Sequence, residues 1–310
     1  MSIKIEYTRI ASFLATICMI AMTLPVAAQD EIPAEKPLTI AEGSHLTVSF
    51  STGYTNLMVN SENLKKSPGG FGLGVEIDYT HFVSNHIGLR LGCDISLATS
   101  SYSMESYSTT SSENVNVWTN IERGESMTVK ADYRTMTSGI RSEYTYTSVG
   151  IPVALAFQGE HWYAAAGAKF HIPLKLHEHS TYGETHTECV SIGNNQVSIP
   201  TANIKSQSVN SMSYDCASRG NTFKPFFVTS LIEGGYRVGR SRGDAICIGV
   251  YAEFAFNECH PDGKEALVAR TDGKIVVSPS LKSDAIKSMR YVNAGLKFQY
   301  DFSFRHPRKR

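Results

Sequence analysis

Apolar and polar residues alternate with a period of two along most of the chain after Gly43. The alternation is longest in the last segment, where one face carries Val292, Ala294, Leu296, Phe298, Tyr300, Phe302 and Phe304. The opposite face carries Asn293, Gly295, Lys297, Gln299 and Asp301. Successive side chains of a β-strand point to opposite sides, so this pattern predicts a strand with one apolar and one polar face. Helical periodicity is not sustained in the sequence, and we predict an all-β protein.

Eight segments share this alternation and are long enough to cross a bilayer as tilted strands. They cover residues 46–54, 71–79, 87–97, 144–157, 162–174, 223–237, 245–257 and 292–304. The gaps between them are alternately long and short, at residues 58–70, 84–85, 100–143, 158–160, 177–222, 239–244 and 258–288. Membrane barrels connect their strands by short periplasmic turns and long extracellular loops in this way. The pattern therefore predicts a transmembrane antiparallel up-and-down β-barrel of about eight strands.

A soluble sandwich or a lipocalin-like barrel is the alternative, and it would bury the apolar faces instead. The polar faces are rich in glycine, which suits a narrow interior where some side chains must be absent. Aromatic residues also gather near the segment ends, as they do at the two interfaces of a bilayer. These residues are Phe157, Trp162, Tyr236, Phe302 and Phe304 at the short gaps, and Tyr54, Phe71, Tyr144, Phe256 and Tyr291 at the long gaps. Both observations favour the membrane barrel.

The first 28 residues have the form of a cleavable secretory signal. Lys4 and Arg9 precede an apolar run from Ile10 to Leu24, and small residues follow near Ala28. An uncleaved membrane anchor would need a longer run of roughly 20 apolar residues. We therefore predict a signal peptide (1–28), a short N-terminal periplasmic segment (29–44), the barrel (45–304) and a basic C-terminal tail (305–310).

Charge and cysteine content narrow the possible partners and covalent links. The chain has 29 basic and 29 acidic residues, which gives no excess of positive charge for nucleic acid, and we expect no such partner. An exported protein can oxidise its cysteines. Those after the signal are Cys93, Cys189, Cys216, Cys247 and Cys259. Because Cys189 and Cys216 bracket one loop, we predict a disulfide between them, with Cys259 as a rival partner.

The register of the segments places charged residues on the polar face, inside the predicted barrel. They are Glu76, Asp78, Arg90, Asp94, Lys169, Glu233, Arg237, Glu253, Lys297 and Asp301. An ion path is one interpretation of such a set. An eight-stranded barrel is only wide enough to be filled by its own side chains, however, and buried charges persist when they are paired. We therefore predict a paired charge network.

The last segment resembles the signal by which outer-membrane barrels are recognised during assembly. Its pattern is polar-x-Gly-x-x-aromatic-x-aromatic, and Asn293, Gly295, Phe298 and Tyr300 occupy the defining positions. With the segment order, residues 45–304 resemble the OmpA/OmpX-type barrels, in the style of the outer-membrane β-barrel domain proteins of Bacteroidetes. The resemblance implies outer-membrane lipid and the barrel assembly machinery as partners. Residues 305–310 depart from the pattern, because the family usually ends on its terminal aromatic residue.

No motif in the sequence fixes a reaction or a cofactor. His177, His179 and His186 lie near acidic residues in one long loop, but their spacing matches no tight metal template, and we predict no metal site. His171 beside Lys169 is the one inward histidine near a charge, and we interpret it as filling the interior. A nucleophile needs its base within about 3 Å, and no short motif fixes such a pair. We predict no catalytic residues and no cofactor.

The long gaps then become the candidate functional surface. Alternation within residues 100–143 predicts a hairpin that extends beyond the barrel. We predict a structural, surface-interaction or adhesion role through the extracellular loops, toward an unknown extracellular ligand or protein. Two alternatives stay open: a small channel or secretion accessory of the PorT kind, and a rim-active enzyme, either lipid A-modifying or omptin-like.

Overall fold

The structure is a computed structural model, and it describes residues 43–84, 86–120, 123–192, 207–209, 212–218, 226–239, 244–259 and 265–304. The signal peptide, the N-terminal segment up to residue 42 and the basic tail lie outside the described residues, and these assignments stay predictions. No helix in the described ranges is long and apolar enough to cross a bilayer.

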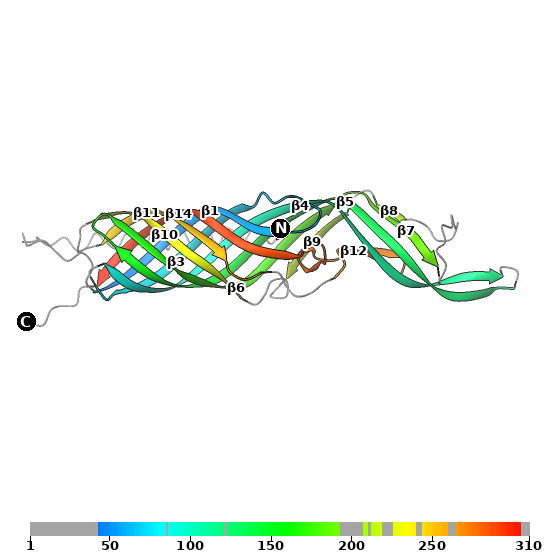
Figure 1. Cartoon of the computed structure of the whole chain (residues 1–310), viewed down its shortest axis with the longest axis horizontal. Helices are drawn as coiled ribbons and strands as arrows, with labels where there is room; N and C mark the ends of the chain where they lie inside the picture. The colour runs from blue at the N-terminus through cyan, green and yellow to red at the C-terminus, as the bar shows by residue number, and fades with distance from the viewer. Residues whose placement is uncertain are drawn as a thin grey trace, which may run out of the picture.

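Eight strands form a closed ring (Figure 1). They are β1 (Gly43–Asn60), β3 (Gly70–Phe82), β4 (Ile87–Asn120), β5 (Glu125–Gln158), β6 (Trp162–Tyr182), β10 (Phe227–Gly239), β11 (Ala245–Ala255) and β14 (Ser288–Phe304). Each pairs antiparallel with the next along the chain, and β14 returns to pair with β1. Each of these strands overlaps a segment predicted from the alternation, although residues 223–225 of one segment lie outside the described residues and β11 ends at Ala255. The all-β, up-and-down fold of about eight strands is confirmed.

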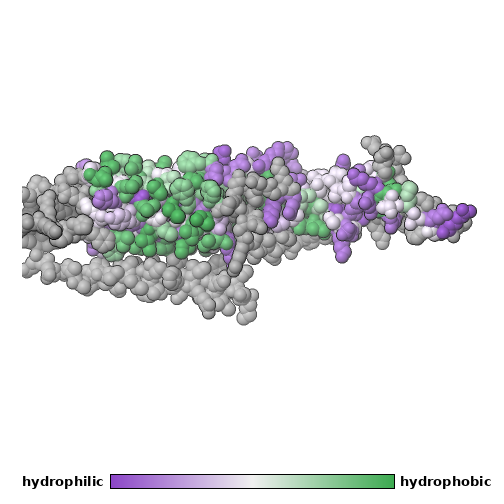
Figure 2. Space-filling model, turned by 90° about the horizontal axis from the view of Figure 1, so that it is seen from below, coloured by the Kyte–Doolittle hydropathy of each residue, from purple (hydrophilic) through white to green (hydrophobic). Residues whose placement is uncertain are grey.

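The barrel turns its apolar side chains outward. Leu296, Ile246 and Leu89 are 50%, 53% and 55% exposed. Lys297 and Glu253, on the opposite faces of their strands, are only 2% and 3% exposed. On the face seen in Figure 2 these side chains form a hydrophobic belt, beside a more hydrophilic projecting part. A soluble barrel would have the reverse arrangement, with a polar outer surface.

Glycines allow neighbouring strands to approach closely inside the barrel. Gly53 of β1 pairs with Gly295 of β14. A Cβ atom on Gly295 would overlap the backbone carbonyl of Thr52. Larger residues therefore do not fit at this crossing, which explains glycine on an otherwise polar face.

β4 and β5 continue beyond the ring as a long two-stranded ribbon (Figure 1). Their pairing runs from Ile87↔Phe157 to Asn120↔Glu125, which confirms the hairpin predicted within residues 100–143. Short strands add to its sides: β2 (Leu64–Lys66) on β4, β7 (Thr185–Ile192) on β5, β8 (Gln207–Val209) on β7 and β9 (Met212–Ser218) on β6.

The ribbon exchanges its faces at Gly139. From Ile140 toward the barrel, the even-numbered residues of β5 are buried. Farther out, the odd-numbered residues Thr137, Thr135 and Tyr133 are buried instead, on the other face of the strand. Gly139 has a φ of 61°, a left-handed conformation that glycine adopts without strain. The buried face of β5 therefore changes from one side of the strand to the other at this residue.

The end of the barrel that carries the long connections is called the outer end here. Residues 265–287 fold back over this end, and we call them the plug. The plug contains a hairpin of β12 (Val268–Thr271) and β13 (Lys274–Val277), followed by a 3₁₀ turn, η2 (Ser280–Lys282). Its turn residues Asp272 and Gly273 both have positive φ, at 51° and 74°. The sequence pattern indicated only a long loop here, so the plug was not predicted.

The plug carries apolar side chains into a shared core at the outer end. Leu267, Val268, Leu281 and Ile286 are almost fully buried against residues of the barrel wall. The wall contributes Leu57, Tyr102, Met104, Tyr107, Ile140, Tyr144, Tyr146, Leu176, Phe227, Met289 and Tyr291. The predicted interface positions of Tyr144 and Tyr291 are therefore wrong, because both point inward. Trp162, Tyr236, Tyr54, Phe71 and Phe256 are exposed.

Candidate functional site

The ten charged residues singled out from the sequence all lie buried inside the barrel. They come from β3, β4, β6, β10, β11 and β14, because the inward face of each strand holds every second residue. The structure brings most of them into two connected groups. The carboxylates and the cations of these groups neutralise each other, because charges that are removed from water need partners of opposite sign.

The larger group is organised around Arg90 and Lys297. The Nη2 atom of Arg90 donates to Glu76 at 2.9 Å, its Nη1 atom donates to Glu233, and its Nε atom lies 3.3 Å from Asp78. The Nζ atom of Lys297 donates to the same two glutamates, at 2.8 Å to Glu76 and 2.7 Å to Glu233. Two cations thus bridge carboxylates from opposite sides of the barrel.

The second group is centred on Lys169. Its Nζ atom lies 3.0 Å from a carboxylate oxygen of Asp94 and 3.0 Å from one of Glu253. The Nε2 atom of His171 lies 3.5 Å from Glu253 and 3.2 Å from the hydroxyl of Thr229. The His171 ring also stacks on Phe227, with centroids 4.7 Å apart. His171 therefore joins the charged layer to the apolar core above it.

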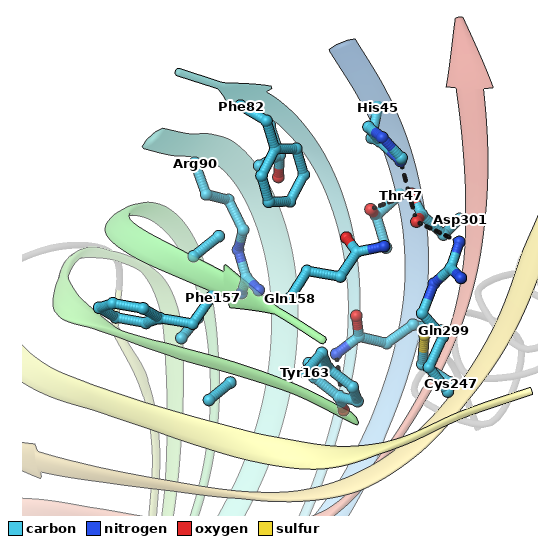
Figure 3. Close-up of a pocket in the computed structure, with 15 residues that line it drawn as sticks. His45, Thr47, Phe82, Arg90, Phe157, Gln158, Tyr163, Cys247, Gln299 and Asp301 are labelled. Atoms are coloured by element: carbon cyan, nitrogen blue, oxygen red, sulfur yellow. Dashed lines mark hydrogen bonds and ion pairs between the residues drawn. The ribbon is translucent and has the colours of Figure 1, made fainter. Parts of the chain in front are cut away.

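A cavity of about 40 Å³ lies at the short-turn end of the barrel (Figure 3). Its polar lining includes Asp301, which contacts His45 Nδ1 at 3.0 Å and Arg237 at 3.8 Å, and Gln299, which donates to the Tyr163 hydroxyl at 3.1 Å. A water molecule needs roughly 10–15 Å³ of such space. The cavity has room for a few waters and none for an organic substrate.

His45 was missed by the sequence reasoning. It is 5% exposed and contacts Asp301. The signal was present, because His45 directly precedes Leu46 and therefore falls on the inward face of β1. Among the described residues, six buried carboxylates of the network face four lysine or arginine side chains, and two histidines each contact one of the carboxylates.

A cluster of hydrogen bonds holds the plug against the outer wall. Glu178 of β6 is 1% exposed, and its Oε1 atom accepts from the Ser280 backbone N–H at 2.7 Å and from the Ser180 hydroxyl at 2.8 Å. The Tyr107 hydroxyl donates to Asp284 at 2.6 Å. Burial, with the Asp284 carboxylate, raises the pKa of Tyr107 to about 12. These contacts join η2 and the residues after it to β4 and β6.

The hairpin of the plug also contacts the ribbon. The guanidinium of Arg270 lies 4.0 Å from the ring centroid of Tyr133, and its Nε atom lies 3.3 Å from Glu113. Cation–π contacts of this kind are favourable. The plug therefore contacts both the barrel mouth and the inner face of the projecting ribbon.

The residues of the predicted assembly signal lie on both faces of β14. Asn293 is buried and accepts a hydrogen bond of 3.0 Å from Tyr251, whereas Phe298 is 42% exposed on the outer surface. Gly295 lies at the close crossing with Gly53. Tyr300, the fourth residue, is partly buried. Their role in assembly stays a prediction.

The predicted disulfide between Cys189 and Cys216 disagrees with the structure. Cys189 is a free thiol. It pairs with Tyr133 of β5, whereas Cys216 pairs with Glu178, whose own partner on β5 is Tyr144. At about 3.3 Å per residue, the two positions on β5 are far more distant than the roughly 6 Å that a disulfide spans between Cα atoms. The spacing in sequence did not reveal this register.

No cluster of metal-ligating residues occurs in the part of the chain that the structure describes. His177, His179 and His186 lie on β6 and β7. One serine–histidine contact, from Ser44 Oγ to His81 Nδ1 at 3.2 Å, lies at the short-turn end of the barrel. That is the end opposite the outer rim, where a rim-active enzyme would act.

No protein-family model and no curated protein matches the sequence. Among solved structures, Ail, the attachment invasion locus protein of Yersinia pestis, matches with 11% identity and a TM-score of 0.30, over 84% of this chain and 100% of that chain. The translocator domain of the autotransporter NalP from Neisseria meningitidis matches with 7% identity and a TM-score of 0.22, over 96% and 98%. An outer membrane channel from Pseudomonas putida F1 matches with 8% identity and a TM-score of 0.26, over 89% and 100%. The pairing of the strands and the burial of their side chains establish the barrel independently of these similarities.

Proposed function

We propose that this protein is an outer-membrane β-barrel of the OmpA/OmpX type, exported by a cleaved signal, that acts at the cell surface through its external elements. Its role is structural, in surface interaction or in adhesion, and not in transport or catalysis. The proposal combines an outer surface suited to lipid, a closed interior and a long projecting ribbon.

The outer surface supports insertion into a membrane. Residues of β11 alternate strictly between buried and exposed over Ala245–Ala255, and a tilted strand of 9 to 11 residues spans the hydrocarbon. Exposed aromatic residues such as Trp162, Tyr236 and Phe71 lie near the ends of the belt. Hydrocarbon is the environment in which such a surface is stable, because water would leave a large continuous apolar area exposed.

The single observation that carries the proposed role is the closure of the interior at two levels. The Arg90 and Lys297 network fills the barrel, and the plug fills its outer end with Leu267, Leu281 and Ile286. The cavity at the short-turn end is too small for a solute larger than water. These features argue against the channel and secretion-accessory alternative.

The test is made on the mature chain refolded in detergent and in planar bilayers. A folded barrel migrates differently on a gel before and after boiling, and we expect this shift together with no steady conductance. Loss of the shift, in a detergent that preserves other barrels, would contradict the membrane barrel. A reproducible open-channel current would replace the interaction role with the channel alternative.

A further inference from the structure

One edge of the projecting ribbon has no partner strand among the described residues. β4 pairs with β5 along one side throughout its length. On the other side it pairs with β3 up to Ala98 and with β2 at Ser103 and Met104, and the Glu105 N–H donates to Asn63 at 3.0 Å. No described strand pairs with this side beyond Glu105. We call residues 106–116 of β4 the free edge.

The opposite side of the ribbon is covered by the chain itself. β5 pairs with β6, and farther out with β7 from Thr137↔Thr185 to Ala131↔Ile192, while β8 adds to β7. In Figure 1 these strands lie beside the ribbon. The sheet therefore accepts added strands on the β5 side, while the β4 side keeps backbone N–H and C=O groups that a further strand can bind.

The free edge lacks most of the features that usually prevent pairing, and its one inward charge, Glu113, is paired with Arg270. Proteins protect exposed edges with lysine, proline, bulges or inward charges. The exposed side chains here are neutral and small: Ser106, Ser108, Thr110, Ser112, Asn114 and Asn116. No lysine or proline occurs between residues 106 and 116, and the pairing with β5 has no bulge there. The one charged residue, Glu113, is partly buried and contacts Arg270.

We propose that the free edge pairs antiparallel with the free edge of a second copy of this chain held in an opposing membrane. This inference rests on the proposed surface role and names its partner. Identical charged edges would repel each other, whereas this one places hydroxyls and amides against the same groups. In a register centred near Ser111, Glu113 of each copy faces a threonine or serine of the other. Every pairing in the main sheet is also antiparallel.

Barrel geometry decides between copies in one membrane and copies in two. β4 runs from the barrel toward the tip of the ribbon, so in every copy it runs away from the membrane that holds that copy. Two copies in one membrane are related by an axis along the membrane normal, so both β4 strands run away from that membrane and do not pair antiparallel. Two copies in facing membranes are related by an axis parallel to the membrane surface, which allows the same edges to lie antiparallel and side by side. Only the facing arrangement extends the sheet.

The experiment measures capture between two populations of phosphatidylcholine vesicles that carry the refolded mature protein. One population is immobilised and the other contains a dye. We expect capture only when both populations carry protein, since many weak contacts add up between two vesicles. Because the edge is neutral, we expect capture to change less than about twofold between ~50 mM and ~500 mM salt.

Two charge-matched variants locate the contact. The edge variant combines Ser108→Lys with Thr110→Lys, which adds two positive charges to each free edge, and we expect capture to fall at least about tenfold. The control combines His186→Lys with Glu188→Gln, which also raises the charge by two. Those residues lie at the same height, two strands from the edge, because Ser108 pairs with Met136, which pairs with His186.

Each contrary result has its own meaning. Capture when only one population carries protein shows lipid binding and overturns the pairing. An edge variant that is captured like the wild type, or a control that is lost equally, also overturns it. Absence of capture by a protein that shows the heat-dependent gel shift overturns the pairing and leaves the proposed barrel intact. Absence of the gel shift overturns both.

Discussion

The Oε1 atom of Glu178 accepts a hydrogen bond of 2.7 Å from the backbone N–H of Ser280, which joins β6 to the plug across 102 residues of sequence. The same oxygen accepts from the Ser280 hydroxyl, which also contacts the Tyr144 hydroxyl. Glu178 and Tyr144 therefore link the 3₁₀ turn of the plug to the wall of the barrel.

Replacing Glu178 should loosen the plug without unfolding the barrel. Glu178→Ala leaves the buried Ser280 N–H without an acceptor, and we expect a loss of about 1 to 3 kcal/mol in the stability of the plug. Glu178→Gln keeps one acceptor oxygen and should lose less. Amide hydrogen exchange in residues 265–287 measures the effect. Equal exchange in wild type and Glu178→Ala would contradict this role.

Arg90 should be far more important to folding than an exposed arginine. Arg90→Ala leaves Glu76, Asp78 and Glu233 facing one another, and we expect the free energy of unfolding to fall by about 3 to 5 kcal/mol. Arg141 offers the control, because its pair with Glu143 is exposed and is worth under about 1 kcal/mol. Urea titration of both variants in vesicles makes the comparison. Similar losses in the two would show that the network is not desolvated.

A charge on the outer belt should destabilise the folded state in a membrane. Leu296 lies near the middle of the apolar face of β14, and Leu296→Lys should reduce the free energy of folding into vesicles by about 2 to 4 kcal/mol. Ser108→Lys, on the ribbon, should stay within about 0.5 kcal/mol of the wild type. If Leu296→Lys were neutral in the same assay, hydrocarbon would not be the neighbour of this face.

Removing the plug should not open the barrel. A variant in which a short Gly-Ser linker replaces residues 266–285 keeps the network of Arg90, Lys169 and Lys297, and this network fills the barrel below. We expect no steady conductance in planar bilayers, although the exposed apolar wall should lower stability. A current in the deletion variant but not in wild type would identify the plug as a gate.

The contact of Tyr107 with the plug should weaken in strong alkali. The pKa of Tyr107 is raised from 10.0 to about 12 by burial, with Asp284 beside it. Because the folded state holds this proton more tightly than the unfolded state, the contribution is complete below about pH 10 and is lost as pH rises toward about 12. Subtracting the pH profile of Tyr107→Phe from that of wild type isolates the effect. A flat difference between pH 9 and 12, to roughly 0.3 kcal/mol, would contradict it.

The barrel was predictable because two independent patterns agree. Alternation places Leu296 and Phe298 on one face and Lys297 on the other, and the alternation of short and long gaps fixes the order of neighbouring strands. The inward position of each charged residue then follows from a period of two, without knowledge of its partners. Which carboxylate meets which cation depends on the register between strands, and a single strand does not contain that information.

The plug and the cysteine positions were not predictable for a related reason. Leu267, Val268, Leu281 and Ile286 are spaced irregularly, since each side chain enters the core from a turn or a short strand instead of a long regular one. Cys189 and Cys216 fall in one long gap of the sequence, but β7 pairs with β5 and β9 pairs with β6. Long-range pairing decides both features.

The left-handed conformation of Gly139 lies at the point where the buried face of the ribbon changes. Beyond this residue the odd-numbered side chains of β5, such as Tyr133, face the plug, whereas nearer the barrel the even-numbered side chains are buried. A residue with a side chain there would strain the backbone, because a positive φ is unfavourable for residues other than glycine. One residue without a side chain thus helps to decide which surface of the ribbon stays open to solvent.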